Sequence, residues 1–177
     1  MTTLIGLTGY KRTGKSTAAK YLEDKHGFVR HNFKDALVEE LKERFPDLIE
    51  LLEIHYNLST PQLFIQKPPL VRALMVNYGT EVRRKDNPDY WVEEWSSKVY
   101  IGDKVVTDDV RFLNEADAIE RRHGIIIRLV RPDITSGGTH KSETEQNEFK
   151  ADYTIQCEPG NHQKLYDELD AILRDIL

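Results

Sequence analysis

The chain has 177 residues, of which 39% are hydrophobic and 31% are charged; this length suits one domain with a sizeable core, and the composition excludes a disordered chain. Its net charge of −5 disfavours a surface that binds duplex nucleic acid, and its single cysteine, Cys157, excludes an intramolecular disulfide or a thiolate metal cluster. The N-terminal residues lack a signal-peptide pattern and no apolar run is long enough for a membrane span, so we expect a cytoplasmic protein.

Short apolar runs predict the β-strands. They are bounded by glycine or polar residues and cover 3–8, 28–33, 104–110, 125–130 and 152–156. The run at 125–130 is the richest in β-branched residues and is expected at the centre of the sheet. The run at 104–110 places Asp108 and Asp109 at its C-terminal end, where a strand would deliver two carboxylates.

Amphipathic stretches between these runs predict helices. They cover 15–25, 35–45, 47–56, 68–79, 89–100, 114–123 and 165–176, with Gly27 and Gly124 as stops and Pro46 as a break. This alternation predicts an α/β fold with a mainly parallel sheet and helices on both faces. Residues 131–151 are polar and lack apolar periodicity, and a loop of this length in a compact domain is typical of a lid.

The segment from Gly9 to Ser16 matches the pattern G-x-x-x-x-G-K-[ST] between a predicted strand and a predicted helix. Glycines let successive backbone N–H groups turn toward phosphate oxygens, and the start of the helix adds the positive end of its dipole. Lys15 is expected to reach the β- and γ-phosphates, and the Ser16 hydroxyl to hold Mg²⁺. The pattern therefore predicts a nucleoside triphosphate site formed by Gly9, Lys11, Arg12, Thr13, Gly14, Lys15, Ser16 and Thr17.

A phosphate-binding loop alone does not name a reaction. The N-K-x-D segment of GTPases is missing and the chain is short for a motor or AAA-type ATPase, which favours a small-molecule or nucleotide kinase. Such a kinase needs a carboxylate at a neighbouring strand end, arginines for the acceptor phosphate and a lid. Asp108 and Asp109 either supply that carboxylate or cap the next turn. The arginine candidates are Arg72, Arg83, Arg84, Arg111, Arg128 and Arg131, and the sequence leaves open which of each neighbouring pair faces the site.

Several stretches resemble the deoxynucleoside monophosphate kinases, a family that is related to adenylate kinase and often encoded by phages. They include "GLTGYKRTGKSTAAKYL", "LMVNYGTEVRR", "NPDYWVEEW", "VVTDDVRFLNEADAI" and "THKSE", and the likeness runs from residue 4 to about residue 175. It implies a three-layer P-loop fold in one domain, 1–177, with a monophosphate-binding helical region at about 34–100 and a lid at about 131–151. The implied reaction is transfer of the ATP γ-phosphoryl group to a deoxynucleoside 5′-monophosphate, with Mg²⁺.

The resemblance also implies roles for single residues. The catalytic set is Lys15, Asp109, Arg111 and Arg131, and Ser16 is the metal-binding hydroxyl. From their positions in the sequence, Asp108 joins Asp109 on the metal side and Arg128 borders the lid. His140 and Glu143 are expected in a hydrogen-bond network of the lid, with a metal site as the alternative. The monophosphate side is expected to use Lys34, Asp35, Arg72, Gly79, Thr80, Glu81, Arg84, Trp91 and Arg111. Many relatives have a lysine at the position of Val38, and the sequence leaves open whether Lys34 replaces it. For Trp91, core packing is the alternative to base stacking.

Other functions are compatible with the same loop. The opening stretch is also similar to dephospho-coenzyme A kinase, but that family carries an acidic D-x-D-like segment where this chain has "HNFKDA". A non-catalytic ATP-binding module is a further alternative, which the presence of Lys15, Ser16, Asp109 and Arg111 disfavours. No pattern indicates the preferred base, or decides between a monomer and a homodimer.

Overall fold

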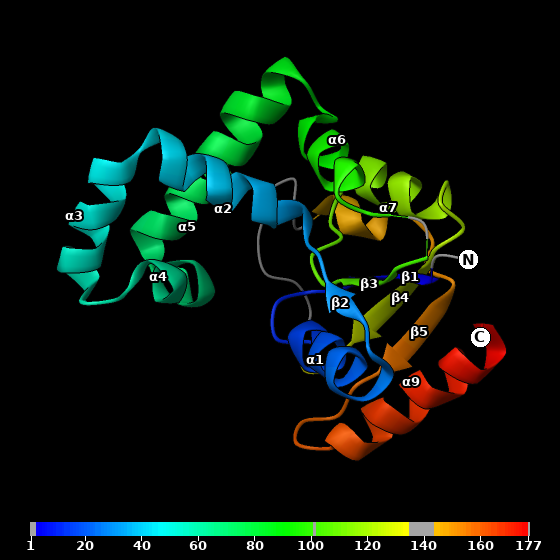
Figure 1. The fold of residues 1–177 in the computed structure, drawn as a ribbon. Coiled ribbons are helices and arrows are strands. Elements are labelled where there is room, and N and C mark those ends of the chain that lie inside the picture. Colours follow the sequence, from blue (N-terminus) through cyan, green and yellow to red (C-terminus); the bar gives the residue numbers. More distant parts are fainter. Residues whose placement is uncertain (1–2, 101, 135–143, 177) are drawn as a thin grey trace. The chain divides into compact units, whose positions relative to one another are not determined.

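The computed structural model describes residues 3–100, 102–134 and 144–176. The chain forms two units: Met1–Asn32 with Ser96–Leu177, which carries the β-sheet, and Phe33–Trp95, which is helical (Figure 1). The helical unit overlaps the region expected at about 34–100, whose monophosphate-binding role stays a prediction. Within the described ranges, no helix is long and apolar enough to cross a bilayer.

A five-stranded sheet in the order β2-β3-β1-β4-β5 is the frame of the first unit. The strands are β1 (Thr3–Thr8), β2 (Val29–Arg30), β3 (Lys104–Thr107), β4 (Ile125–Val130) and β5 (Tyr153–Gln156). All neighbours pair in parallel, which confirms the predicted α/β class. The strand at 125–130 is an inner strand, but the middle position belongs to β1, because chain connectivity rather than β-branching sets the order.

Three of the strands are shorter than predicted, β2 and β3 by several residues and β5 by one. β2 ends after Arg30, and one further backbone hydrogen bond follows it, from the His31 N–H to the Val106 carbonyl at 3.0 Å. Beyond that bond a side chain continues the pairing, since Asn32 Oδ1 accepts a hydrogen bond from the Asp108 N–H at 2.8 Å. Thr107 likewise donates its hydroxyl to the His31 carbonyl at 2.7 Å. The chain after β2 and the end of β3 are thus joined by side chains at the carboxyl edge of the sheet.

Helices cover both faces of the sheet. Successive side chains of β1 point to opposite faces. Ile5 and Leu7 belong to a core shared with α1 (Lys15–His26) and α9 (His162–Ile176), which lie on one side of the sheet in Figure 1. Gly6 faces α7 (Leu113–Glu120), where an added Cβ would lie 2.6 Å from Ile119 Cδ1. The predicted layering of helices on both faces is therefore confirmed.

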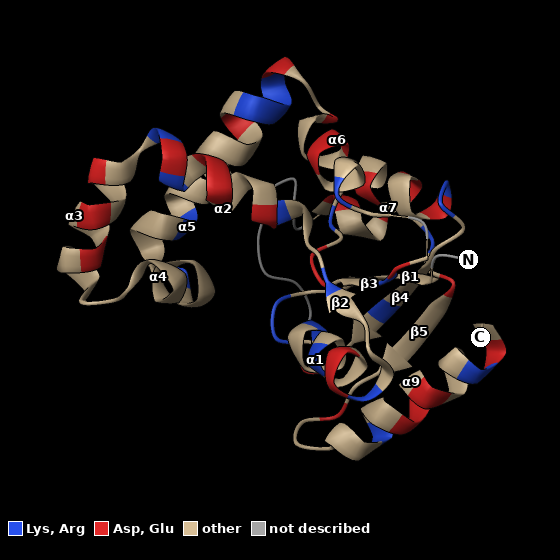
Figure 2. Ribbon diagram, viewed as in Figure 1, with Lys and Arg blue, Asp and Glu red and all other residues tan. Residues whose placement is uncertain are grey.

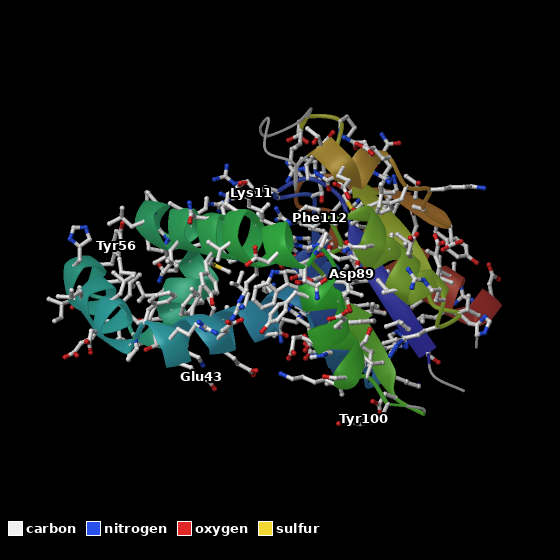
Figure 3. All side chains as sticks on the ribbon, turned by 90° about the horizontal axis from the view of Figure 1, so that it is seen from above. Lys11, Glu43, Tyr56, Asp89, Tyr100 and Phe112 are labelled. Atoms are coloured by element: carbon white, nitrogen blue, oxygen red, sulfur yellow. The ribbon has the colours of Figure 1, made fainter. Side chains whose placement is uncertain are left out.

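Six helical segments form the second unit. They are α2 (Phe33–Arg44), α3 (Pro46–Tyr56), α4 (Thr60–Gln66), α5 (Pro69–Val76), η1 (Asn77–Arg84) and α6 (Tyr90–Ser97), the last of which runs on past Trp95. Their buried side chains, among them Leu41, Leu63 and Val71, form a separate core. Figure 3 shows the side chains between these helices and labels Tyr56 of α3, which packs against this core.

Two features of this unit differ from the sequence prediction. No helix was expected at 60–66, where Ser59 and Gln62 form a capping box that starts α4. The helix that begins at Pro69 does not end near Gly79 but continues as the π-helical turns of η1. Gly79 acts there as a packing residue: an added Cβ would lie 3.1 Å from Leu37 Cδ2, so a side chain would crowd α2.

Candidate active site

The site begins where the order of the sheet changes direction. β1 leads through α1 to β2 on one side, whereas β3, its neighbour, leads through α7 to β4 on the other side. Open α/β sheets bind ligands at the carboxyl ends of strands at such a switch point. The segments Gly9–Ser16 and Asp108–Arg111 follow these two adjacent strands, so the fold brings the predicted phosphate loop and the predicted carboxylates to the same edge.

The phosphate loop has a shape that its glycines permit. Gly9 and Gly14 have φ values of 135° and 106°, and an added Cβ on Gly9 would lie 2.2 Å from the Leu129 carbonyl oxygen. Thr13 is buried, and its hydroxyl donates to the Tyr10 carbonyl at 2.9 Å, which closes the loop on itself. The loop is therefore held in one conformation by its own backbone and by contact with β4.

The positive charge of this loop is concentrated where α1 begins. Lys15 Nζ donates to the carbonyls of Gly9 at 2.5 Å and Tyr10 at 2.7 Å, so its ammonium group lies over the loop. The first turn of α1 contains no acidic residue, and Gly14 at its N-cap has no side chain to occupy the N–H groups. Figure 2 shows the loop before α1 in the colour of basic residues, and Figure 3 labels Lys11 there. These features suit a phosphate group.

The two predicted carboxylates differ in exposure. The Asp108 side chain is only 4% exposed and forms an ion pair with Arg30, with 3.4 Å between Oδ2 and Nη1. Asp109 is half-buried. Arg30 was not among the predicted site residues. Its sequence signal is a basic residue inside the short apolar run 28–33.

Two buried glutamates shape the turn that carries Arg111. The backbone N–H groups of Arg111 and Phe112 donate to Glu115 Oε2 at 2.7 and 3.1 Å. Glu145 Oε1 accepts from the Leu113 N–H at 2.9 Å. Both carboxylates lie at the N-terminus of α7, where negative charge is favourable. No sequence pattern indicates Glu115, because Phe112 rather than a serine or threonine stands at the cap position, and none indicates Glu145, which lies 32 positions from Leu113.

The structure separates the roles of Arg128 and Arg131. Arg131 donates from Nη1 to the Arg12 carbonyl of the phosphate loop at 3.2 Å, while its Nε and Nη2 bind Asp133 at 3.0 and 2.5 Å. Arg128 instead donates to the Phe149 carbonyl at 2.8 Å, and burial lowers the pKa of its guanidinium. Of these two arginines, Arg131 is thus the one that contacts the loop. The predicted lid residues His140 and Glu143 lie outside the described residues.

The helical unit places Arg83 and Arg84 differently. Arg83 forms a short ion pair with Glu40, and its guanidinium lies 4.8 Å from the centre of the Tyr90 ring. Although burial opposes it, hydrogen bonds from Arg83 and Tyr78 lower the pKa of Glu40. Arg84 is half-buried and donates to the Pro88 carbonyl at 3.2 Å. Arg83 is thus tied into an ion-pair cluster inside the unit.

The remaining predicted acceptor residues are spread over this unit. Arg72 is exposed on α5, and Lys34 and Asp35 are half-buried at the start of α2. Gly79, Thr80 and Glu81 lie together in η1. Trp91 is 3% exposed and donates its indole N–H to the Gly79 carbonyl at 3.0 Å. This burial gives Trp91 a packing role, the alternative to base stacking.

Comparison with known proteins identifies a curated relative and solved structures with a similar fold. A protein of Acanthamoeba polyphaga mimivirus named "Putative deoxynucleotide monophosphate kinase" is 32% identical over 163 residues, which is 84% of each chain. The crystal structure of TT1252 from Thermus thermophilus covers 99% of this chain and 98% of its own, with a TM-score of 0.50 and 18% identity. Shikimate kinase from Aquifex aeolicus covers 97% and 96%, with a TM-score of 0.49 and 15% identity. No family model matches the chain.

Proposed function

Because this chain belongs to the deoxynucleotide monophosphate kinase family, we propose that it transfers the γ-phosphoryl group of ATP to a deoxynucleoside 5′-monophosphate, giving ADP and the diphosphate. Family membership is what the sequence resemblance had indicated. The structural observation that carries the proposal is the phosphate loop, in which Lys15 lies over the carbonyls of Gly9 and Tyr10 at the carboxyl end of β1.

ATP and Mg²⁺ are the proposed cofactors. The loop from Gly9 to Thr17 suits a triphosphate because it combines a glycine backbone, a basic side chain and the N-terminus of α1. Ser16 is exposed, and a hydroxyl together with the Asp108 and Asp109 carboxylates is the oxygen-rich ligand set that Mg²⁺ prefers. When bound, the metal supplies charge neutralisation for the triphosphate.

The residues of the first unit have distinct tasks in this proposal. Lys15 binds the oxygens of the transferred group and holds it in line, while Arg131 meets the charge that develops on that group. Arg111 serves the acceptor, because its guanidinium can bind the phosphate, while the neighbouring Asp109 carboxylate would orient the water shell of the metal. The acceptor oxygen belongs to an ionised phosphate, so its attack needs no general base. Positioning and charge neutralisation carry the reaction.

The helical unit is proposed to bind the deoxynucleoside monophosphate. Arg72 and Arg84 suit the phosphate because a guanidinium can bind two of its oxygens at once. Lys34, Asp35 and the segment Gly79–Glu81 complete the proposed set. We further propose that the protein works in the cytoplasm, that of the host if a phage encodes it, as a monomer or a homodimer.

The decisive experiment is a coupled assay of ADP release with a panel of deoxyribo- and ribonucleoside monophosphates. Turnover of at least one deoxynucleotide is expected. Dephospho-coenzyme A serves as the rival acceptor in the same assay. Turnover of that compound without turnover of any deoxynucleotide would overturn the proposed substrate, and ATP binding without any turnover would favour a non-catalytic module.

A further inference from the structure

The side chain of Arg30 connects the phosphate-loop helix to the carboxyl end of β3. Its Nη2 binds Glu23 of α1 at 2.5 Å and lies 3.5 Å from the carbonyl oxygen of Ser16 in the first turn of that helix. Its Nη1 lies 3.4 Å from Asp108 Oδ2. One guanidinium therefore contacts the backbone of the proposed magnesium-binding serine and one of the two carboxylates proposed beside the metal.

The burial of these groups makes the arrangement specific. The Asp108 side chain is 4% exposed, whereas those of Arg30 and Glu23 are 27% and 33% exposed. A buried carboxylate is costly without a counter-charge, and Arg30 supplies that charge and holds the Asp108 side chain in place. Glu23 in turn fixes Arg30, because a planar guanidinium that binds an acid on each side has little freedom to turn.

The backbone of Asp108 is held from the same side. Its N–H donates to Asn32 Oδ1 at 2.8 Å, and Asn32 follows Arg30 by two residues along the chain. The end of β2 thus secures both the main chain and the side chain of Asp108. The side chain of Arg30 in β2 and that of Asn32 just after it thus both contact Asp108.

We propose that Arg30 is a positioning residue for the magnesium side of the nucleotide site, an inference that rests on the proposed function. Arg30 keeps Ser16 and Asp108 in one fixed arrangement without touching the nucleotide. Groups that orient the ligands of a metal in this way typically change metal affinity or activity by about 10- to 100-fold when they are removed. Glu23 is the second member of this arrangement, because it anchors Arg30.

The test measures binding of β,γ-imido-ATP by isothermal titration calorimetry, once with Mg²⁺ and once with EDTA. In Arg30→Met, the Mg²⁺-dependent gain in affinity is expected to fall about tenfold, while the affinity in EDTA stays within about threefold of the wild type. If the Mg²⁺-dependent gain in affinity is unchanged, or if affinity falls equally with Mg²⁺ and with EDTA, Arg30 only stabilises the fold.

Matched variants keep the test informative if Arg30→Met folds poorly. Glu23→Gln and Arg30→Lys are expected to reduce the Mg²⁺-dependent gain while the thermal midpoint stays close to that of the wild type. Asp24→Asn is the control, since Asp24 is the next acid on α1 and forms an exposed ion pair with Lys20 at 3.0 Å. If Glu23→Gln and Arg30→Lys both behave like Asp24→Asn, the proposal is wrong.

This experiment is independent of the acceptor. It uses no monophosphate, so a protein that phosphorylates no deoxynucleotide would disprove the proposed function and leave the test of Arg30 intact. Conversely, an enzyme active on deoxynucleotides whose Arg30→Met variant keeps the full Mg²⁺-dependent gain would disprove only the role of Arg30.

Discussion

Lys15 and Gly9 make complementary contributions to the phosphate loop. Lys15 supplies a cation that is already held over two loop carbonyls, at 2.5 and 2.7 Å. Gly9 allows the loop to lie close to β4, because a side chain at this position would collide with the Leu129 carbonyl. Charge and shape can therefore be tested by separate substitutions.

Replacing Lys15 with alanine is expected to lower kcat by about two to three orders of magnitude, the range seen when one donor to a developing charge is lost. The thermal midpoint should change little, since Lys15 makes its contacts in the loop rather than in the core. Steady-state kinetics and a thermal scan give both values. Lys20→Ala, on the exposed face of the same helix, is the control; equal rates for the two variants would remove Lys15 from the site.

Gly9→Ala is expected to weaken imido-ATP binding at least about tenfold, which corresponds to 1.4 kcal/mol. The new Cβ would force the loop away from β4. Gly27→Ala is the matched control, because Gly27 also has a positive φ, at 70°, yet nothing lies within 4 Å of its added Cβ. It should lose about 1–2 kcal/mol of stability with unchanged nucleotide affinity. Equal nucleotide affinity in both variants would contradict the proposed role of the loop shape.

At the level of elements, α2 and η1 are joined by a charged cluster. Glu40 of α2 accepts from Arg83 and Tyr78 of η1, and Arg44 adds a contact at 2.8 Å. The Glu40 side chain is 14% exposed, so these partners replace most of its water. These ion pairs and hydrogen bonds hold α2 against the π-helical segment η1, a rare type of helix.

Glu40→Gln should destabilise the protein by about 3 kcal/mol at neutral pH, since it leaves Arg83 without its counter-charge. The pKa of Glu40 is lowered by folding, so its contribution is present above the ordinary value of 4.5 and is lost as the pH falls through the lower folded value. Urea unfolding at several pH values should therefore show that the free energy of unfolding falls less toward acid pH in the variant than in the wild type. Asp117→Asn breaks an exposed pair with Arg121 and should cost less than about 1 kcal/mol. Equal losses in the two variants would argue against the cluster.

At the level of the whole molecule, the residues proposed for ATP all lie in the first unit, whereas those proposed for the acceptor are Arg111 of the first unit and residues of the helical unit. Hydrogen exchange can test this division. Imido-ATP with Mg²⁺ is expected to slow exchange in the phosphate loop and the first turn of α1. A deoxynucleoside monophosphate is expected to slow exchange in residues 72–84 of the helical unit. Slowed exchange with the monophosphate in the first unit alone would contradict the acceptor residues proposed on α5 and η1.

Sequence alone predicted the features that depend on neighbouring residues. The strand at 3–8 and the helix that follows it were both predicted, because each is encoded by consecutive residues with a regular pattern. The phosphate-binding role of the turn between them stays a prediction. Arg30 was missed because its partner Asp108 lies 78 positions away, and no local pattern reports such a pair. The π-helical turns were missed because Gly79 resembles a helix stop, whereas contact with Leu37 decides its role.

The helical unit is one continuous segment inserted between β2 and β3, and these two strands pair directly with each other, Val29 opposite Val105 and Arg30 opposite Val106. The register of the sheet therefore does not depend on how many residues the insertion contains. An insertion of another length would therefore leave the frame of the proposed triphosphate site unchanged while altering the proposed acceptor region.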